Sequence, residues 1–137
     1  MSYEVDPSLD LYVKAALGKK ASGVVVLDVH ELTSIADVFI LCSGRSNRQV
    51  TAIAEFIQRE LKKSGKKPLS VEGEKEGHWV LLDYGHVIIH VFYESVRHFY
   101  DLEGLWTDAK RIKTESLEDY VEEDDFDEEE DYEVEII

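Results

Sequence analysis

The chain has 137 residues, of which 44% are hydrophobic and 10% aromatic, enough for one buried core and too few for a second large domain. Its formal charge of −15 reflects 30 acidic and 15 basic residues, but 14 of the acids and none of the bases lie between Glu115 and Ile137. Residues 1–114 are therefore near neutral. This distribution argues against a protein that coats nucleic-acid phosphates with Lys and Arg, and no apolar run is long enough to predict a membrane span.

The single cysteine, Cys42, allows no internal disulfide and no cysteine-rich metal site. The N-terminal residues lack the charged start and the hydrophobic stretch of a signal peptide, and their acids disfavour an organelle transit peptide. From these features we expect a soluble, cytoplasmic protein.

The first third of the chain contains one helix pattern and two strand patterns. Apolar residues at helical spacing predict a short helix that Ser8 caps and that ends at Gly18. The β-branched run of residues 24–29 predicts a central strand buried on both faces, and residues 37–43 predict a second strand of the same type.

A long amphipathic helix is expected next, capped by Ser46 or Asn47 and ending near Lys63. Residues 69–73 predict a short edge strand. Two apolar strands, residues 79–84 and 87–93, are separated by Gly85-His86, which is a strong hairpin signal. A short helix capped by Ser95 is expected after the hairpin.

Strands that alternate with helices, together with one hairpin, predict the α/β class: a single domain over residues 1–113 with a mixed β-sheet packed by helices. Residues 114–137 are acidic and of low complexity, so we expect a disordered tail. Truncation after Thr114 is accordingly expected to leave the melting temperature within a few degrees.

Metal and cofactor sites are not predicted. His86 and His90 are four residues apart, but on a strand that spacing separates them by roughly 13 Å. His30 and His78 lie in predicted loops without a Cys or carboxylate partner at ligand spacing. The histidines considered are His30, His78, His86, His90 and His98.

The Ser43-Gly44 turn before the long helix is the one weak catalytic pattern. Nucleotidyltransferases use such a turn, but they follow it with an Asp-x-Asp pair that holds magnesium. The only Asp-x-Asp in this chain is Asp125–Asp127, in the acidic tail. A helix start is therefore the favoured role of this turn, and a small nucleotidyltransferase-like enzyme is the alternative function.

The hairpin has two different faces. If Gly85-His86 is a two-residue turn, one face carries Val80, Leu82, Tyr84, Val87, Ile89 and Val91 and is expected to lie under the helices. The other face mixes large apolar side chains with an acid and an imidazole, as protein-binding surfaces do. The alternative is that Trp79 and Phe92 complete the core while Asp83 caps the turn, and spacing alone does not separate the two. That second face carries Trp79, Leu81, Asp83, Ile88, His90 and Phe92.

Residues 78–106 closely resemble the signature of the ribosomal silencing factor (RsfS, Iojap-like) family. The resemblance consists of a Trp-x-x-x-Asp-Tyr-Gly hairpin, an Ile-His-Val-Phe strand and an Arg-x-x-Tyr-x-Leu-Glu-x-Leu-Trp segment. It extends over residues 5–112. It implies a nucleotidyltransferase-like fold without the catalytic carboxylates, which agrees with the missing Asp-x-Asp on a core strand.

The resemblance also implies a function without catalysis. Family members bind the large ribosomal subunit through its ribosomal protein fourteen, block joining of the small subunit, and repress translation when nutrients are short. We therefore expect a ribosomal partner, a homodimer in the free protein, and at most peripheral contact with rRNA.

We expect the partner site on the second face of the hairpin and the helix after it. Trp79, Leu81 and Phe92 would be apolar anchors, and Asp83 would accept hydrogen bonds from a basic partner. Tyr84 falls on the predicted core face, and Arg97 with Glu103 could instead form an internal ion pair. The full set of expected partner-binding residues is Trp79, Leu81, Asp83, Tyr84, His90, Phe92, Arg97, Tyr100, Glu103 and Trp106.

Overall fold

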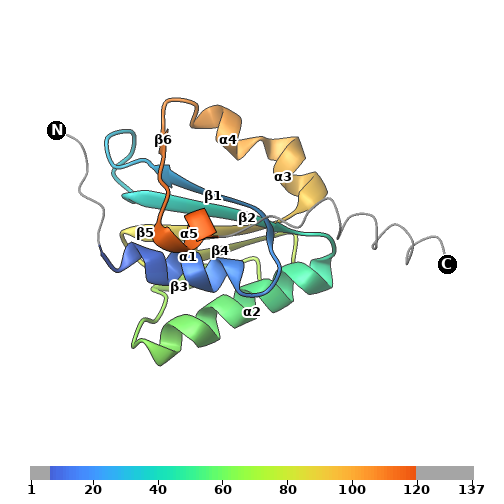
Figure 1. The fold of residues 1–137 in the computed structure, drawn as a ribbon. Helices are drawn as coiled ribbons and strands as arrows, with labels where there is room; N and C mark the ends of the chain where they lie inside the picture. Colours follow the sequence, from blue (N-terminus) through green and yellow to red (C-terminus); the bar gives the residue numbers. More distant parts are fainter. Residues whose placement is uncertain (1–6, 120–137) are drawn as a thin grey trace.

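The computed structural model describes residues 7–119, so the predicted tail from residue 120 onward lies outside the described residues (Figure 1). Among the described residues, every helix is too short or too polar to span a bilayer. The elements in chain order are α1 (Leu9–Leu17), β1 (Ser22–Asp28), β2 (Val38–Gly44), α2 (Asn47–Lys63), β3 (Ser70–Glu72), β4 (Trp79–Asp83), β5 (Val87–Tyr93), α3 (Glu94–Tyr100), α4 (Leu102–Leu105), β6 (Lys110–Arg111) and α5 (Glu115–Asp119).

The six strands form one mixed sheet in the order β3-β4-β5-β2-β1-β6. β2 and β5 pair in parallel. The other adjacent pairs in the sheet, β3–β4, β4–β5, β1–β2 and β1–β6, are antiparallel. The prediction of a single α/β domain with a mixed sheet is therefore confirmed. The central pair is almost wholly apolar because it is covered on both faces, as parallel strands usually are.

Helices α1 and α2 lie side by side on one face of the sheet (Figure 1). The predicted cap is confirmed, since the Ser46 Oγ accepts a hydrogen bond from the Gln49 N–H at 3.0 Å. One stripe of α2 is fully buried against the sheet and α1, which makes this the main core. The buried stripe comprises Val50, Ile53, Ala54, Ile57 and Leu61.

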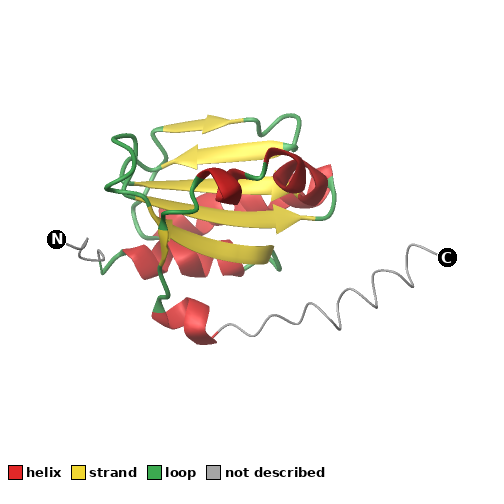
Figure 2. Ribbon diagram, turned by 90° about the horizontal axis from the view of Figure 1, so that it is seen from above, coloured by secondary structure: helices red, strands yellow, loops and turns green. Residues whose placement is uncertain are grey.

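The opposite face of the sheet is covered only in part by the short helices α3 and α4 (Figure 2). A second apolar cluster lies there, with half-buried side chains at its margin. Its buried members are Leu27, Val29, Ala36, Phe39, Leu41, Ile88 and Phe92. The cover over this second cluster is therefore incomplete.

Two local expectations were wrong. The predicted central strand at residues 24–29 is β1, which lies next to the sheet edge, and β6 pairs only with its Leu27 and Asp28. A β-branched run does not distinguish a central strand from one beside an edge. The helix expected to begin at Ser95 begins at Glu94, with Tyr93 in an extended conformation at the cap.

The predicted boundary at residue 113 also differs from the structure. Asp10 of α1 accepts hydrogen bonds from the Ser116 N–H at 3.0 Å and from its hydroxyl at 2.6 Å. Leu117 packs against the main core, and Thr114 is buried. Residues 114–119 are thus part of the folded body, because one leucine and one cap offset an otherwise acidic composition.

Candidate partner-binding site

The hairpin turn has the predicted register. The Tyr84 N–H donates to the Val87 carbonyl at 2.9 Å, and Gly85 has a φ of +93°, which favours glycine. Trp79 is opposite Phe92, and Leu81 is opposite His90. The two faces of the hairpin are therefore divided as expected, with the face carrying Val80 and Ile89 in the main core.

A series of aromatic contacts runs across the second face. The Trp79 ring lies 4.9 Å from Phe92 and 5.3 Å from Tyr100 of α3. Phe39 lies 4.9 Å from His90 and 5.3 Å from Trp106. Trp79 and Trp106 are half-buried, so this layer joins the sheet to α3 and to the end of α4.

His90 and Phe92 lie beneath this layer. Phe92 is 0% exposed and His90 is 5% exposed. Burial lowers the pKa of His90 to about 4, so its imidazole is neutral, and its Nδ1 accepts a hydrogen bond from the Trp79 indole at 3.1 Å. The expectation that these two residues face a partner is corrected: they support Trp79 from below.

Tyr84 does not join the site either. It is buried on the helical face, where its ring lies 5.4 Å from Tyr12 of α1 in an edge-on arrangement. Burial raises the pKa of its hydroxyl to about 12. Its inclusion among the partner-binding residues is therefore corrected to a core role, in line with the alternation along β4.

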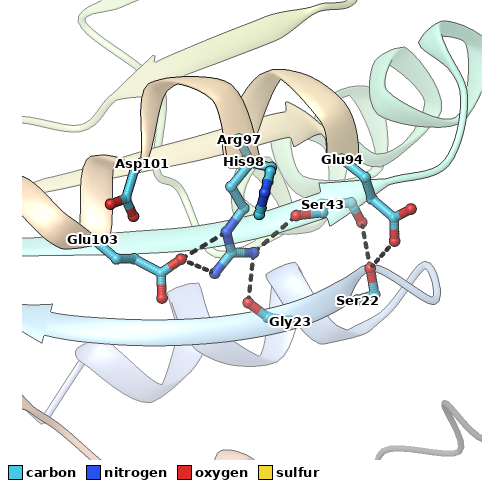
Figure 3. A pocket seen from close by; sticks show the side chains of 8 residues that line it. All are labelled: Ser22, Gly23, Ser43, Glu94, Arg97, His98, Asp101 and Glu103. Atoms are coloured by element: carbon cyan, nitrogen blue, oxygen red, sulfur yellow. Dashed lines mark hydrogen bonds and ion pairs between the residues drawn. The ribbon is translucent and has the colours of Figure 1, made fainter.

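Arg97 and Glu103 form an internal ion pair (Figure 3). The Arg97 guanidinium lies 2.9 Å from the Glu103 carboxylate and donates at 2.8 Å to both the Gly23 carbonyl and the Ser43 hydroxyl. One side chain of α3 thereby links β1, β2 and α4. The pair holds the short helices on the sheet, which corrects the expectation that these two residues bind a partner directly.

A polar pocket of about 340 Å³ lies around this ion pair (Figure 3). Its carboxylates come from α3, from α4 and from Asp101 between them, and none comes from a core strand. The Ser43 hydroxyl already accepts a hydrogen bond from Arg97. Within residues 7–119 no three His, Cys, Asp or Glu side chains are grouped to hold a metal ion. The lining residues are Ser22, Gly23, Ser43, Glu94, Arg97, His98, Asp101 and Glu103.

The part of this face left open is an aromatic patch, which we define as Trp79, Phe99 and Tyr100. Phe99 is 80% exposed and Tyr100 54%, and their rings lie 5.2 Å apart. Leu105 of α4 is 75% exposed. Phe99 and Leu105 were not among the predicted site residues, because apolar positions in a short helix suggest core until the packing is known.

Asp83 is consistent with both alternatives for this face, a cap of the turn and a contact with a partner. Its carboxylate accepts a hydrogen bond from the Gly85 N–H at 2.8 Å, so it caps the turn. The side chain is nevertheless half-exposed beside half-buried Leu81. The acids of α3 and α4 are paired with bases, since Glu94 lies 4.0 Å from Arg45, and Glu103 lies 2.9 Å from Arg97 and 3.6 Å from Arg111. The open face is therefore apolar at the aromatic patch, with polar and charged side chains around it.

A family model described as "Ribosomal silencing factor during starvation" matches residues 3–136. The chain belongs to the ribosomal silencing factor family. RsfS of Halalkalibacterium halodurans is 39% identical over 109 residues, which is 80% of this chain and 93% of that protein. A solved structure from Chromobacterium violaceum is 38% identical, with a TM-score of 0.72 over 77% of this chain and 88% of that one.

A more distant relative extends the family to organelles. The mouse "Mitochondrial assembly of ribosomal large subunit protein 1" is 28% identical over 102 residues, which is 72% of this chain and 45% of that protein. The two relatives are thus named for silencing and for subunit assembly, and neither name describes an enzyme. Membership associates the chain with the ribosome.

Proposed function

We propose that this protein acts as a ribosomal silencing factor, which binds the large ribosomal subunit through ribosomal protein fourteen and blocks association with the small subunit. Translation would thereby be repressed when nutrients are limiting. The observation that carries the proposal is the aromatic patch, in which the neighbouring rings of Phe99 and Tyr100 are exposed. Exposed aromatic side chains within a polar rim are typical of protein-binding surfaces.

The family supports the choice of subunit. The description of the matched family model mentions starvation, and the name of the mouse relative mentions the large ribosomal subunit. A factor that occupies the surface of one subunit can prevent joining by steric exclusion alone. Steric exclusion requires no chemical reaction, so the proposed role does not include catalysis. We propose that this role is carried out in the cytoplasm.

The Ser43-Gly44 turn is consistent with that role. The Ser43 hydroxyl accepts a hydrogen bond from Arg97 at 2.8 Å and is buried, which leaves it poorly placed to attack a substrate. Incubation with magnesium and labelled nucleotides tests this part. Transfer of label that is lost in Ser43→Ala would contradict it. The nucleotidyltransferase-like fold expected from the resemblance stays a prediction.

In the free protein we propose that a second copy covers the aromatic patch. Exposed aromatic side chains that touch one another are commonly protected by association, and two-fold homodimers are the commonest form. Light scattering of the free protein should give the dimer mass. Addition of ribosomal protein fourteen should convert it to a one-to-one complex, and a monomer throughout would contradict the dimer.

Co-sedimentation is the decisive test of the main proposal. The protein is centrifuged with isolated large subunits, isolated small subunits and intact ribosomes in separate tubes. Binding confined to free large subunits supports the proposal. Equal binding to small subunits or to intact ribosomes would contradict it. A second arm adds small subunits to the complex of factor and large subunit, and formation of intact ribosomes at the normal rate would contradict anti-association.

A further inference from the structure

Most of the basic residues lie within or directly after α1 and α2. Residues 9–20 and 47–68, which form α1, α2 and the segments after them, hold nine bases and three acids. The rest of residues 7–119 holds six bases and 14 acids. We call the nine bases the basic face: Lys14, Lys19, Lys20, Arg48, Arg59, Lys62, Lys63, Lys66 and Lys67.

The basic face is solvent-accessible and poorly neutralised. Eight of its nine members are exposed, and Lys66 is half-exposed. Among residues 7–119, one ion pair involves this set, between Lys63 and Glu60 at 2.6 Å. Two members bridge the helices, since the Lys66 ammonium lies over the Tyr12 ring and that of Lys19 over the Phe56 ring. The bases of α1 and α2 therefore belong to one surface.

The chain leaves the folded body beside this surface. Ser116 of α5 is hydrogen-bonded to Asp10 in the first turn of α1. Lys14 is one turn further along α1, about 6 Å along the axis, and Lys66 lies over the intervening Tyr12. The segment that follows, residues 120–137, has 18 residues, 11 acids and no base.

We propose that residues 120–137 dock on the basic face of the same chain and shield it from other polyanions. The charges are complementary, with a net −11 in the segment against +6 in residues 9–20 and 47–68. The segment is also long enough, because 18 residues span up to ~60 Å when extended, whereas α2 is ~25 Å long. This proposal does not depend on the ribosomal one.

Docking in cis has a regulatory consequence. A polyanion such as RNA can reach the basic face only by displacing the segment. The tether gives the segment a high effective concentration, so a weak electrostatic contact suffices. The interaction weakens with ionic strength, because the Debye length falls from about 10 Å at about 0.1 M salt to about 3 Å at about 1 M.

Carbodiimide cross-linking of the full chain tests the contact directly. The reagent joins carboxylates of residues 120–137 to lysines within reach, and mass spectrometry identifies the pairs. We expect links to Lys14, Lys62, Lys63 and Lys67, lost at about 1 M salt. Lys110 is the control, since it is exposed and outside the basic face. Equal labelling of Lys110 would overturn the proposal, and so would an absence of links.

Mixing isotopically heavy and light chains before cross-linking separates docking in cis from docking between copies. Links within one isotope support the proposal, and heavy–light links would overturn it. Shielding is measured on heparin with a full-length variant whose 11 tail acids are Asn or Gln. We expect it to elute at higher salt than the native chain. The further exchange Lys62→Gln with Lys63→Gln should remove part of this gain, and Lys110→Gln should not; equal losses would overturn the proposal.

Discussion

The Trp79 indole donates a hydrogen bond to the buried Nδ1 of His90 at 3.1 Å. Both side chains lie on the face of β4 and β5 that is opposite the main core. This contact fixes the orientation of Trp79, whose ring also lies 4.9 Å from Phe92 and 5.3 Å from Tyr100. The aromatic patch is thereby attached to the sheet through half-buried Trp79. Substitution of the exposed side chains, Phe99 and Tyr100, should change partner binding, whereas substitution of the buried Phe92 should change stability.

Tyr100→Ala and Phe99→Ala are expected to weaken large-subunit binding more than they weaken the fold, because both side chains are exposed. Truncation of a central aromatic anchor typically costs ~2 kcal/mol or more, which is at least a ~25-fold loss of affinity. Phe92→Ala is instead expected to lower the free energy of unfolding by about 3–5 kcal/mol, because Phe92 is fully buried. Melting temperature and co-sedimentation are measured on the same variants.

Val80→Ala is the matched control on the helical face, where Val80 is fully buried. It should lower stability by about 1–4 kcal/mol and reduce binding only through unfolding. A stable Val80→Ala protein that binds poorly, together with a Tyr100→Ala protein that binds normally, would show that the partner uses the other face.

Substitution at Asp83 separates charge from turn capping. Asp83→Asn keeps an oxygen that can accept from the Gly85 N–H, so we expect an unchanged melting temperature and a weaker interaction with a basic partner. Asp83→Lys should weaken binding further. Both effects should shrink at high salt, because the attraction is screened. Affinities that do not respond to salt would count against a charge contact.

His90 predicts a specific loss of stability in acid. Its folded pKa of about 4 lies below the unfolded value of about 6.5, so the neutral form is favoured by folding. The contribution is complete above pH 6.5 and is lost as the pH falls toward 4, by ~3 kcal/mol at ~1.4 kcal/mol per pKa unit. Urea unfolding between pH 7 and about 4 measures it.

His90→Asn should flatten that pH dependence, since Asn places an acceptor near the position of Nδ1 and does not titrate. His98→Asn is the control at an exposed histidine. If His98→Asn flattens the curve as much as His90→Asn, the acid sensitivity does not come from the buried imidazole.

Arg97→Met is expected to destabilise the protein by about 3 kcal/mol, because it leaves the Glu103 carboxylate, the Ser43 hydroxyl and the Gly23 carbonyl without their donor. Arg111→Gln is the control. Arg111 is exposed and lies 3.6 Å from the other oxygen of Glu103, so its loss should change stability by about 0.5 kcal/mol or less. An Arg97→Met protein with normal stability and no ribosome binding would show a direct partner contact.

Two truncations test the position of the boundary. Ending the chain after Asp119 should leave the melting temperature of the body nearly unchanged. Ending it after Thr114 removes α5, the Asp10–Ser116 hydrogen bonds and the packing of Leu117. We expect a loss of about 1–2 kcal/mol, or about 4–8 °C in melting temperature. Equal melting temperatures would restore the boundary inferred from composition.

The sequence by itself determined the elements whose signals are local. Ser46 caps α2 because its side-chain oxygen can accept a hydrogen bond from the free N–H three residues later. The Gly85-His86 turn sets the hairpin register because few residues other than glycine adopt a positive φ. Register then divides the two faces by simple alternation. The family signature lies on this hairpin and the segment after it, so the ribosomal class could also be inferred from the sequence.

Only the tertiary structure decided which side chains of the second face remain exposed. Alternation assigns Trp79, His90 and Phe92 to one face, but exposure depends on where α3 and α4 lie, and that is fixed by Arg97 reaching Gly23 and Ser43 far away in the sequence. Those helices and Trp79 bury Phe92 and leave Phe99 open. Long-range contacts of this kind leave no periodic signal, which is why alternation along the strands could not separate the buried side chains of this face from the exposed ones.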